Sequence, residues 1–287
     1  MPRQTYDLIR PRARDTSVVF ASPHSGRDYG DSFLRRACID PLTLRSSEDA
    51  FVDQLFSAAP LVGAPLLLAR APRAYVDLNR SPDELDPAVI DGARPVAHNP
   101  RIASGLGVVP RVVSGARAIY RGKLSMAEAR RRIDSCWHPY HRTLQTLLDE
   151  SLQMFGQAIL IDCHSMPHEA MDGIARRGAP RPDVVLGDRF GASACSDLVD
   201  QVEEAFRAAG LNTVRNSPFA GAFVAQHYGR PSRNQHVIQI EIDRALYMDE
   251  RLIRPTANFA ALQHSLSGVI ARVAAIGRAD ALPLAAE

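Results

Sequence analysis

Two short apolar segments of this chain each end in a polar cluster that contains a histidine. Residues 158–161 lead into Asp162 and His164, and residues 18–21 lead into a loop that contains His24. Continuous apolar runs of this length are typical of strands that are buried on both faces of a sheet. Open α/β sheets carry their chemistry at the carboxyl ends of such strands. The pattern therefore predicts an α/β fold with two histidines at one edge of the sheet.

A third apolar segment, residues 237–244, contains an acid in the place of an apolar residue. Glu241 stands between Ile240 and Ile242, where its charge is costly to bury without a partner. One interpretation pairs it with Arg244 of the same segment. The other makes it the base that takes a proton from a metal-activated water.

The rest of the chain alternates between apolar segments and helical patterns. Strands are expected at 65–69, 184–186 and 212–215, and helices at 33–39, 50–59, 125–155 (interrupted at Pro139), 195–209 and 258–276. Residues 74–80 alternate in the manner of a strand, whereas 1–16, 81–118 and 217–232 are expected to be irregular. This order favours a mostly parallel sheet flanked by helices, formed by one domain over residues 1–287.

The composition argues against several classes of protein. The 34 Lys and Arg residues nearly balance the 32 Asp and Glu residues, and a formal net charge of +2 predicts neither nucleic-acid nor membrane binding. No apolar run approaches the roughly 20 residues of a membrane span, and the N-terminus lacks the apolar core of a signal peptide. The four cysteines form no C-x-x-C pair, so neither a zinc–cysteine site nor a disulfide framework is predicted. A reducing, cytoplasmic location is expected.

The two strand-end histidines are the best candidates for metal ligands. Catalytic zinc usually takes three protein ligands from His and Asp or Glu, and keeps a position open for water. His24 and His164 supply two of them, and the third is expected to be a carboxylate. Asp49 and its neighbour Glu48 both precede a helical pattern and are both candidates. Asp162 is either a ligand itself or an acceptor for the N–H of a ligating histidine.

Two further stretches are candidates for contacts to a substrate. Asn79 and Arg80 close the run 77–80, and an amide beside a guanidinium makes a good clamp for an anion. The same run, followed by Ser-Pro, is also ordinary turn chemistry. His227 lies in a glycine-flanked loop and is a second candidate.

Taken together, these motifs resemble those of the N-formylglutamate amidohydrolases (N-formylglutamate deformylases), a family related in fold to the zinc carboxypeptidases and aspartoacylases. The matching pieces occur in family order within about residues 15–255, namely 22–26, 47–53, 77–80, 107–111, 162–166 and 239–248. Each piece is weak alone, and the ordered series is specific. The resemblance implies a single-domain, three-layer α/β/α sandwich of the phosphorylase/hydrolase type, whose sheet is mixed and mostly parallel.

The resemblance also implies roles for individual residues. The implied zinc ligands are His24, Asp49 and His164, the implied general base is Glu241, and the implied substrate contacts are Asn79, Arg80, Arg244 and Tyr247. The implied reaction is hydrolysis of N-formyl-L-glutamate to formate and L-glutamate, with a small-molecule substrate and neither nucleic acid nor membrane as partner.

Other functions on the same scaffold stay open at this point. One is a zinc hydrolase that acts on N-formimidoyl-glutamate, on another N-acyl amino acid or on a small peptide. Another is a carboxylate-binding protein without catalysis. Zinc suits a His–carboxylate–His hydrolytic site, and iron, cobalt or manganese can occupy the same ligands. The sequence predicts no oligomeric state.

Overall fold

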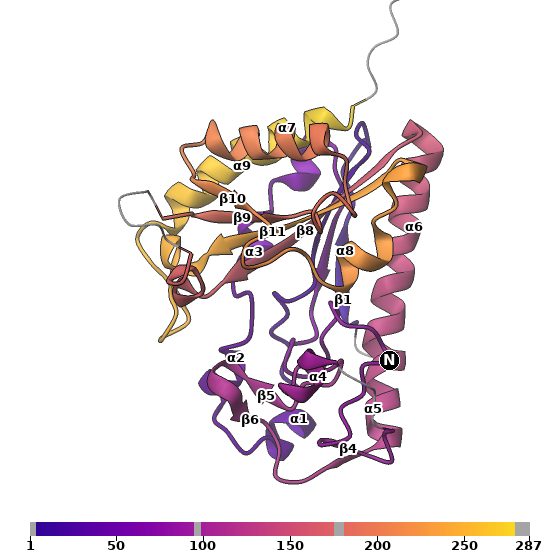
Figure 1. Ribbon diagram of the computed structural model, residues 1–287, viewed down its shortest axis with the longest axis vertical. Coiled ribbons are helices and arrows are strands. Elements are labelled where there is room, and N and C mark those ends of the chain that lie inside the picture. The colour runs from indigo at the N-terminus through magenta and orange to yellow at the C-terminus, as the bar shows by residue number, and fades with distance from the viewer. Residues whose placement is uncertain (1–3, 95–98, 175–180, 279–287) are drawn as a thin grey trace, which may run out of the picture.

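A seven-stranded mixed sheet forms the centre of the computed structural model, which describes residues 4–94, 99–174 and 181–278 (Figure 1). From one edge to the other, the strands are β1 (Tyr6–Ile9), β3 (Leu66–Ala69), β2 (Val18–Ser22), β8 (Ala158–Met166), β11 (Gln235–Asp243), β9 (Val184–Gly187) and β10 (Thr213–Arg215). Strand β1 runs antiparallel to β3, and β9 runs antiparallel to β11, whereas the other neighbours are parallel. The mixed, mostly parallel sheet is thereby confirmed.

Helices cover both faces of this sheet. The helices α3 (Val52–Leu55), α7 (Ser196–Arg207) and α9 (Phe259–Ile276) pack on one face, and α5 (Met126–Arg132), α6 (His138–Phe155) and α8 (Phe223–Tyr228) on the other. Side chains of a strand alternate between faces. In β8, Ile159 and Ile161 therefore enter the first core, and Leu160 enters the second. The three-layer sandwich is confirmed.

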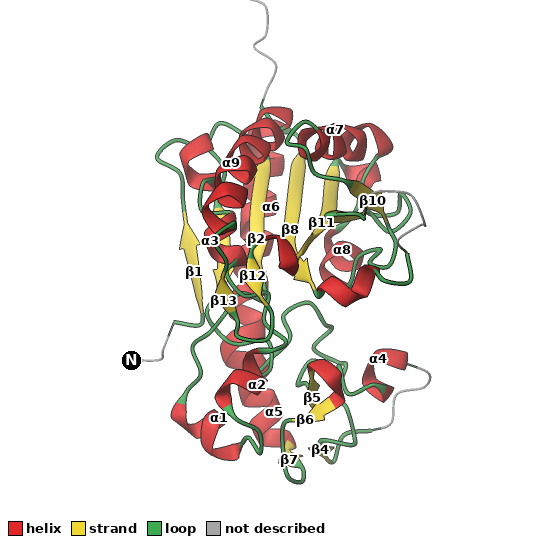
Figure 2. Cartoon of the chain, turned by 90° about the vertical axis from the view of Figure 1, so that its left-hand side faces the viewer, coloured by secondary structure: helices red, strands yellow, loops and turns green. Residues whose placement is uncertain are grey.

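A lower layer lies beyond the carboxyl ends of the central strands (Figure 2). It comprises α1 (Asp31–Arg36), α2 (Pro41–Arg45) and α4 (Pro100–Ala103), with short strands β4 (Ile90–Asp91), β5 (Val112–Val113), β6 (Arg117–Ala118) and β7 (Leu124–Ser125). Phe33, Leu44 and Ile119 form part of a small core of its own. Elsewhere, β12 (Met248–Asp249) pairs with β13 (Arg254–Pro255), and single 3₁₀ turns occupy Ala59–Val62, Ser114–Ala116, His168–Met171, Pro231–Arg233 and Arg244–Leu246.

Four segments differ from the structure predicted for them, and one of these is the region expected to be irregular at 81–118, which contains the short elements β4, α4, β5 and β6. Residues 74–80 form turns, because the amides of Tyr75 and Val76 both donate to the carbonyl of Pro72. The N-terminal segment contains β1, which a local pattern did not reveal because its order comes from pairing with β3. The region expected to be a loop at 217–232 contains α8.

The helical region predicted at 125–155 is divided close to Pro139, as that proline led us to expect. A π turn, Ile133–Trp137, separates α5 from α6, and Pro139 occupies the first turn of α6. A proline is tolerated there because the first amides of a helix have no intrahelical acceptor.

One helix among the described residues, α9, is long and apolar enough to cross a membrane by length and composition alone, which the sequence-based expectation did not anticipate. Its residues Leu266, Val269 and Ile270 are buried in the core between α9 and the sheet. The apolar composition of α9 is therefore used in packing within this fold.

A fully buried arginine joins α5 to the lower layer. The Arg132 side chain has no exposed surface, and its Nε donates to Glu128 Oε1 at 2.9 Å. Its Nη1 donates to the Tyr75 carbonyl at 3.1 Å and to the Tyr120 hydroxyl at 2.6 Å. The guanidinium carbon also lies 4.2 Å from the centre of the Tyr75 ring. This one side chain thus connects three segments of the chain.

Replacing Arg132 by methionine is expected to lower the free energy of unfolding by about 3–5 kcal/mol, because the Glu128 carboxylate then loses its buried partner. Urea denaturation followed by circular dichroism measures the change. Arg131→Met is the matched control, since Arg131 also pairs with Glu128 but its side chain is 67% exposed. An exposed pair contributes about 0–1 kcal/mol, so equal losses in the two variants would contradict the prediction.

Candidate active site

Three buried side chains from separate segments meet at the carboxyl ends of β2 and β8. His24 follows β2 by two residues, and His164 belongs to β8, which is the parallel neighbour of β2. Asp49 is brought to them by its own backbone, because its amide donates to the His24 carbonyl at 3.0 Å. The three residues that the sequence suggested as metal ligands therefore lie together.

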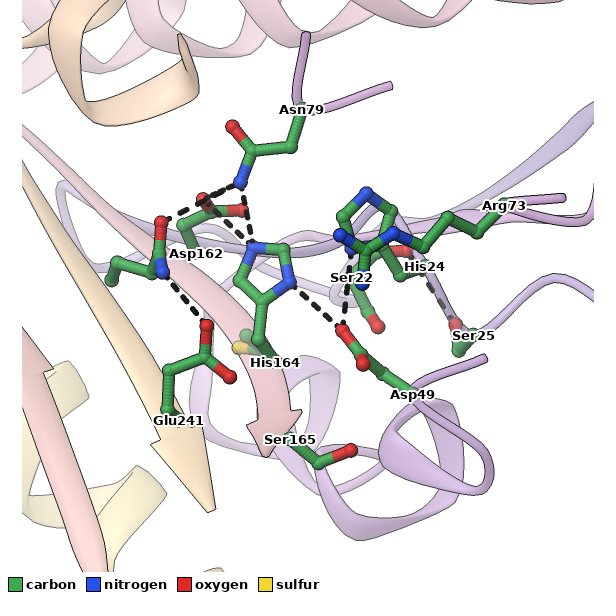
Figure 3. A network of polar contacts seen from close by, with 12 residues as sticks. Ser22, His24, Ser25, Asp49, Arg73, Asn79, Asp162, His164, Ser165 and Glu241 are labelled. Atoms are coloured by element: carbon green, nitrogen blue, oxygen red, sulfur yellow. Dashed lines mark hydrogen bonds and ion pairs between the residues drawn. The ribbon is translucent and has the colours of Figure 1, made fainter. Parts of the chain in front are cut away.

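Both histidines direct the same ring nitrogen toward the aspartate (Figure 3). Nδ1 of His24 lies 3.4 Å from Asp49 Oδ2, and Nδ1 of His164 lies 2.9 Å from the same oxygen. One possible ligand atom from each residue falls within 4.8 Å of the other two. His24 Nδ1 is buried and has no hydrogen-bond partner among the described residues. Two nitrogens and a carboxylate oxygen are the donor set of a catalytic zinc site, so these residues fit a divalent metal.

The opposite nitrogen of each histidine contacts a second carboxylate. His24 Nε2 lies 2.7 Å from Asp77 Oδ1, and His164 Nε2 lies 3.0 Å from Asp162 Oδ2. Such contacts fix the tautomer and the ring orientation of metal-ligating histidines, and they leave Nδ1 free for the metal. Of the two roles considered for Asp162, the geometry therefore favours the acceptor over the ligand.

The two adjacent acids at residues 48 and 49 point in different directions. The Glu48 carboxylate is 3.1 Å from Arg45 Nε and does not border the cavity, whereas Asp49 does. Arg244 Nη2 donates to Asp49 Oδ1 at 3.1 Å, and this contact holds the carboxylate between the histidines. Of the two acids, Asp49 is therefore the one placed to act as a metal ligand, and this role stays a prediction.

Glu241 lies on β11 directly opposite His164 of β8. Gln239 Nε2 donates to Glu241 Oε1 at 2.8 Å, and within the described part of the chain Glu241 makes no ion pair with Arg244. Burial raises the pKa of Glu241 to about 7, although the positive charges of His164, Arg73 and Arg244 oppose the increase. A carboxyl group with this pKa can both accept and return a proton near neutral pH.

The pKa of Asp49 is shifted in the opposite direction. Burial opposes its ionisation, but the imidazoles of His164 and His24 beside its carboxylate hold the pKa of Asp49 well below its usual value. Two neighbouring acids whose pKa values are pushed apart are typical of a site in which one stays charged and the other transfers protons. Asp49 fits the first role and Glu241 the second.

A cavity of about 580 Å³ opens over these residues. Its wall includes the three candidate ligands, Glu241, and the arginines Arg73, Arg80, Arg101 and Arg244. This volume suits a small organic molecule.

Three of the predicted substrate contacts border the cavity, namely Asn79, Arg80 and Arg244. The Asn79 amide is already engaged, since Nδ2 lies 3.3 Å from Asp162 Oδ2 and 3.1 Å from His164 Nε2. Its Oδ1 accepts from the Val224 amide at 2.7 Å. In this structure Asn79 positions the outer carboxylate and the histidine, and its contact with a substrate stays a prediction.

The other two predicted contacts lie away from the wall. Tyr247 is fully buried beneath the site, where its hydroxyl donates to the Ala50 carbonyl at 3.0 Å. His227 is exposed on α8 and stacks on Phe223, because the loop expected there is a helix that turns this side chain outward. Neither residue belongs to the cavity lining.

Sequence patterns did not identify Arg73, Asp77 and Gln239, which all border the cavity. Arg73 Nε donates to Asp77 Oδ2 at 3.1 Å, and Asp77 in turn holds His24. The only signal for Asp77 was its place in the run 77–80, and Arg73 lies in a turn without periodicity. Gln239 alternates with Glu241 on one side of β11, so its position follows once that strand is known.

Residues 16–248 match the profile of a family described as N-formylglutamate amidohydrolase, which is more than half of the chain. The chain belongs to this family. Two N-formylglutamate deformylases are similar along most of their length. The one from Pseudomonas aeruginosa is 33% identical over 260 residues, covering 88% of this chain and 89% of its own. The one from Pseudomonas putida is 29% identical over 240 residues, covering 81% and 82%.

One solved structure agrees with this assignment to the amidohydrolase family, and a second shares only the fold. The N-formylglutamate amidohydrolase from Ralstonia eutropha JMP134 is 37% identical, with a TM-score of 0.88 over 95% of this chain and 98% of its own. A protein from Agrobacterium tumefaciens, Atu2144, is 18% identical with a TM-score of 0.61 over 96% of each chain, and it shares the fold. The present chain is thus an amidohydrolase of the N-formylglutamate deformylase family.

Replacing Asp162 by asparagine is expected to weaken the binding of a divalent metal such as zinc about 10- to 100-fold. An amide N–H facing His164 Nε2 favours the tautomer that carries its hydrogen on Nδ1, the nitrogen that faces Asp49. Competition with a chromophoric chelator measures the affinity, and Asp91→Asn is the control, since Asp91 is exposed on β4. Equal zinc affinities for the wild type and Asp162→Asn would show that this carboxylate does not set the tautomer.

Proposed function

We propose that this protein is a zinc-dependent N-formylglutamate deformylase, which hydrolyses N-formyl-L-glutamate to formate and L-glutamate. The observation that carries the proposal is the buried His24–Asp49–His164 cluster with Glu241 beside it in one cavity. The family of the chain and the names of its relatives supply the substrate.

The proposed metal would be held by Nδ1 of His24, Nδ1 of His164 and the Asp49 carboxylate. Zinc is preferred because two imidazoles and one carboxylate are typical of hydrolytic zinc sites, and iron, cobalt or manganese are the alternatives. When bound, a divalent ion lowers the pKa of a water molecule and polarises an amide carbonyl.

Glu241 carries the proton in this proposal. Its carboxylate accepts a proton as the water oxygen forms a bond to the formyl carbon. It then gives this proton to the nitrogen of the amide as the C–N bond breaks, which releases formate and the free amine of glutamate. The contact from Gln239 orients one carboxylate oxygen, so the other is available for the transfer.

The arginines of the cavity supply the charges that this reaction requires. Arg73 is bound to Asp77 through Nε only, and electrostatic attraction to Asp77, Asp49 and Glu241 raises the pKa of Arg73 despite its burial. Its remaining N–H groups are assigned to the negative charge that develops on the carbonyl oxygen. Arg80 is assigned to the α-carboxylate of the substrate, because this carboxylate lies next to the reacting amide and a guanidinium binds a carboxylate well.

Formate release from N-formyl-L-glutamate by the purified protein tests the proposal. We expect release that stops after treatment with a chelator and returns when zinc is added. If the protein binds one zinc per chain but releases no formate, its substrate is a different acylated amino acid. A protein that neither binds metal nor hydrolyses the substrate would overturn the proposal.

A further inference from the structure

The cavity contains more positive than negative side chains among the described residues that line it. Four arginines border it, and two of them are paired with carboxylates. Arg73 Nε lies 3.1 Å from Asp77, and Arg244 Nη2 lies 3.1 Å from Asp49. The remaining two arginines, Arg80 and Arg101, therefore decide what charge the cavity presents to a ligand.

The Arg80 guanidinium donates its hydrogen bonds to uncharged backbone carbonyls. Its Nε donates to the Leu106 carbonyl at 3.0 Å, and its Nη1 donates to the Asn79 carbonyl at 2.8 Å. Burial lowers the pKa of Arg80, and the nearby positive charge of Arg101 acts in the same direction, while Asp77 opposes both. Arg80 is thus a buried cation that has no carboxylate in hydrogen-bond contact within the described ranges.

Arg101 is the second cation without a carboxylate. Within residues 4–94, 99–174 and 181–278, its guanidinium has no hydrogen bond and no ion pair, although it borders the cavity. Glu84 also attracts Arg80 electrostatically, though less than Asp77 does, and its two oxygens accept from the Ser81 amide at 3.1 Å and from Asn99 Nδ2 at 3.3 Å. It does not belong to the cavity lining.

The segment that carries Arg101 is anchored on both sides. Asn99 Oδ1 accepts from the Arg101 amide at 3.0 Å, and the side chain of Ile102 is buried. At the other end, the Leu106 carbonyl is bound by Arg80. The backbone of Arg101 is therefore fixed relative to Arg80, and its long side chain is left at the wall of the cavity.

We propose that Arg101 binds a second carboxylate of the substrate and so makes the enzyme selective for acidic N-acyl amino acids. This inference rests on the proposed function and deepens it. With the amide at the His24–Asp49–His164 end, Arg80 holds the α-carboxylate and Arg101 holds the side-chain carboxylate. The two guanidiniums repel one another in the empty cavity, and a dianion neutralises both. A monoanionic substrate leaves one of them without a partner.

The test compares N-formyl-L-glutamate with N-formyl-L-glutamine, which has nearly the same shape but lacks the second charge. For Arg101→Met we expect kcat/KM for the glutamate substrate to fall roughly 10- to 100-fold, the range for a lost hydrogen bond between charged groups. The value for the glutamine substrate should stay nearly unchanged. Arg101→Lys should keep part of the preference, because it retains the charge. Arg121→Met is the control, since Arg121 is exposed and does not border the cavity.

A loss of equal size for both substrates, or no change for either, would overturn the role of Arg101. If the wild type hydrolyses neither substrate, the proposed function fails, and binding then decides the inference on its own. Isothermal titration with L-glutamate and L-glutamine gives this answer. Weaker binding of glutamate alone in Arg101→Met supports a carboxylate site, and equal affinities in the two proteins overturn it.

Discussion

Glu241→Gln is expected to reduce formate release by about 10²–10⁴-fold while the protein keeps its full metal content. Glutamine has the same size as glutamate, and its carbonyl oxygen can still accept the hydrogen bond that Gln239 Nε2 donates. What is lost is the group that accepts a proton from water and returns it to the leaving nitrogen. The variant should therefore fold and bind zinc normally. Its kcat should fall strongly, and its KM should change much less.

Glu204→Gln is the matched control, because Glu204 is exposed on α7 and remote from the cavity lining. Steady-state kinetics give the rates, and elemental analysis of the dialysed proteins gives the metal content. A fully active Glu241→Gln protein would remove Glu241 from its proposed role. Loss of metal together with activity would make it a residue that supports the metal site and not the proton carrier.

The sequence predicted the positions of the central strands because each is a continuous apolar run. Strands β2, β8 and β11 are buried on both faces, so apolar residues predominate in them ahead of the functional side chains, although Gln239 precedes Glu241 in β11. The apolar runs alone therefore place His24, His164 and Glu241 at one edge of the sheet. Asp49 was harder to place, because what distinguishes it from Glu48 is its contacts with distant residues, namely its backbone bond to His24 and its ion pair with Arg244.

What the sequence could not predict depends on contacts between distant segments. Asp77 and Arg73 lie in an irregular segment far from His24 in the sequence. They belong to the site only because the fold brings Asp77 against His24, where Arg73 pairs with Asp77. Likewise β1 exists because β3 offers it an edge, and α8 turns His227 away from the cavity. Tyr247 matched a motif, but its hydroxyl is used within the core. Motifs locate such residues near a site, and packing decides which of them face it.

Asp49→Asn is expected to weaken zinc binding by more than the roughly 100-fold that loss of an outer carboxylate can cost, because a neutral amide replaces the anionic ligand. Formate release should fall in parallel and should not return at zinc concentrations that restore the chelated wild type. Since a ligand that binds only the folded state stabilises it, added zinc should raise the Tm of the wild type and leave that of the variant nearly unchanged.

Glu48→Gln is a demanding control for this result, because it removes the adjacent acid from the same turn. The Glu48 side chain pairs with Arg45 and does not reach the cavity, so this variant should bind zinc and release formate like the wild type. The opposite outcome, with zinc lost from Glu48→Gln and retained by Asp49→Asn, would assign the acidic ligand to Glu48. Because Arg244 is buried against Asp49, urea denaturation of metal-free Asp49→Asn separates loss of the ligand from loss of this ion pair. A metal-free stability equal to that of the metal-free wild type would attribute the whole effect to the metal.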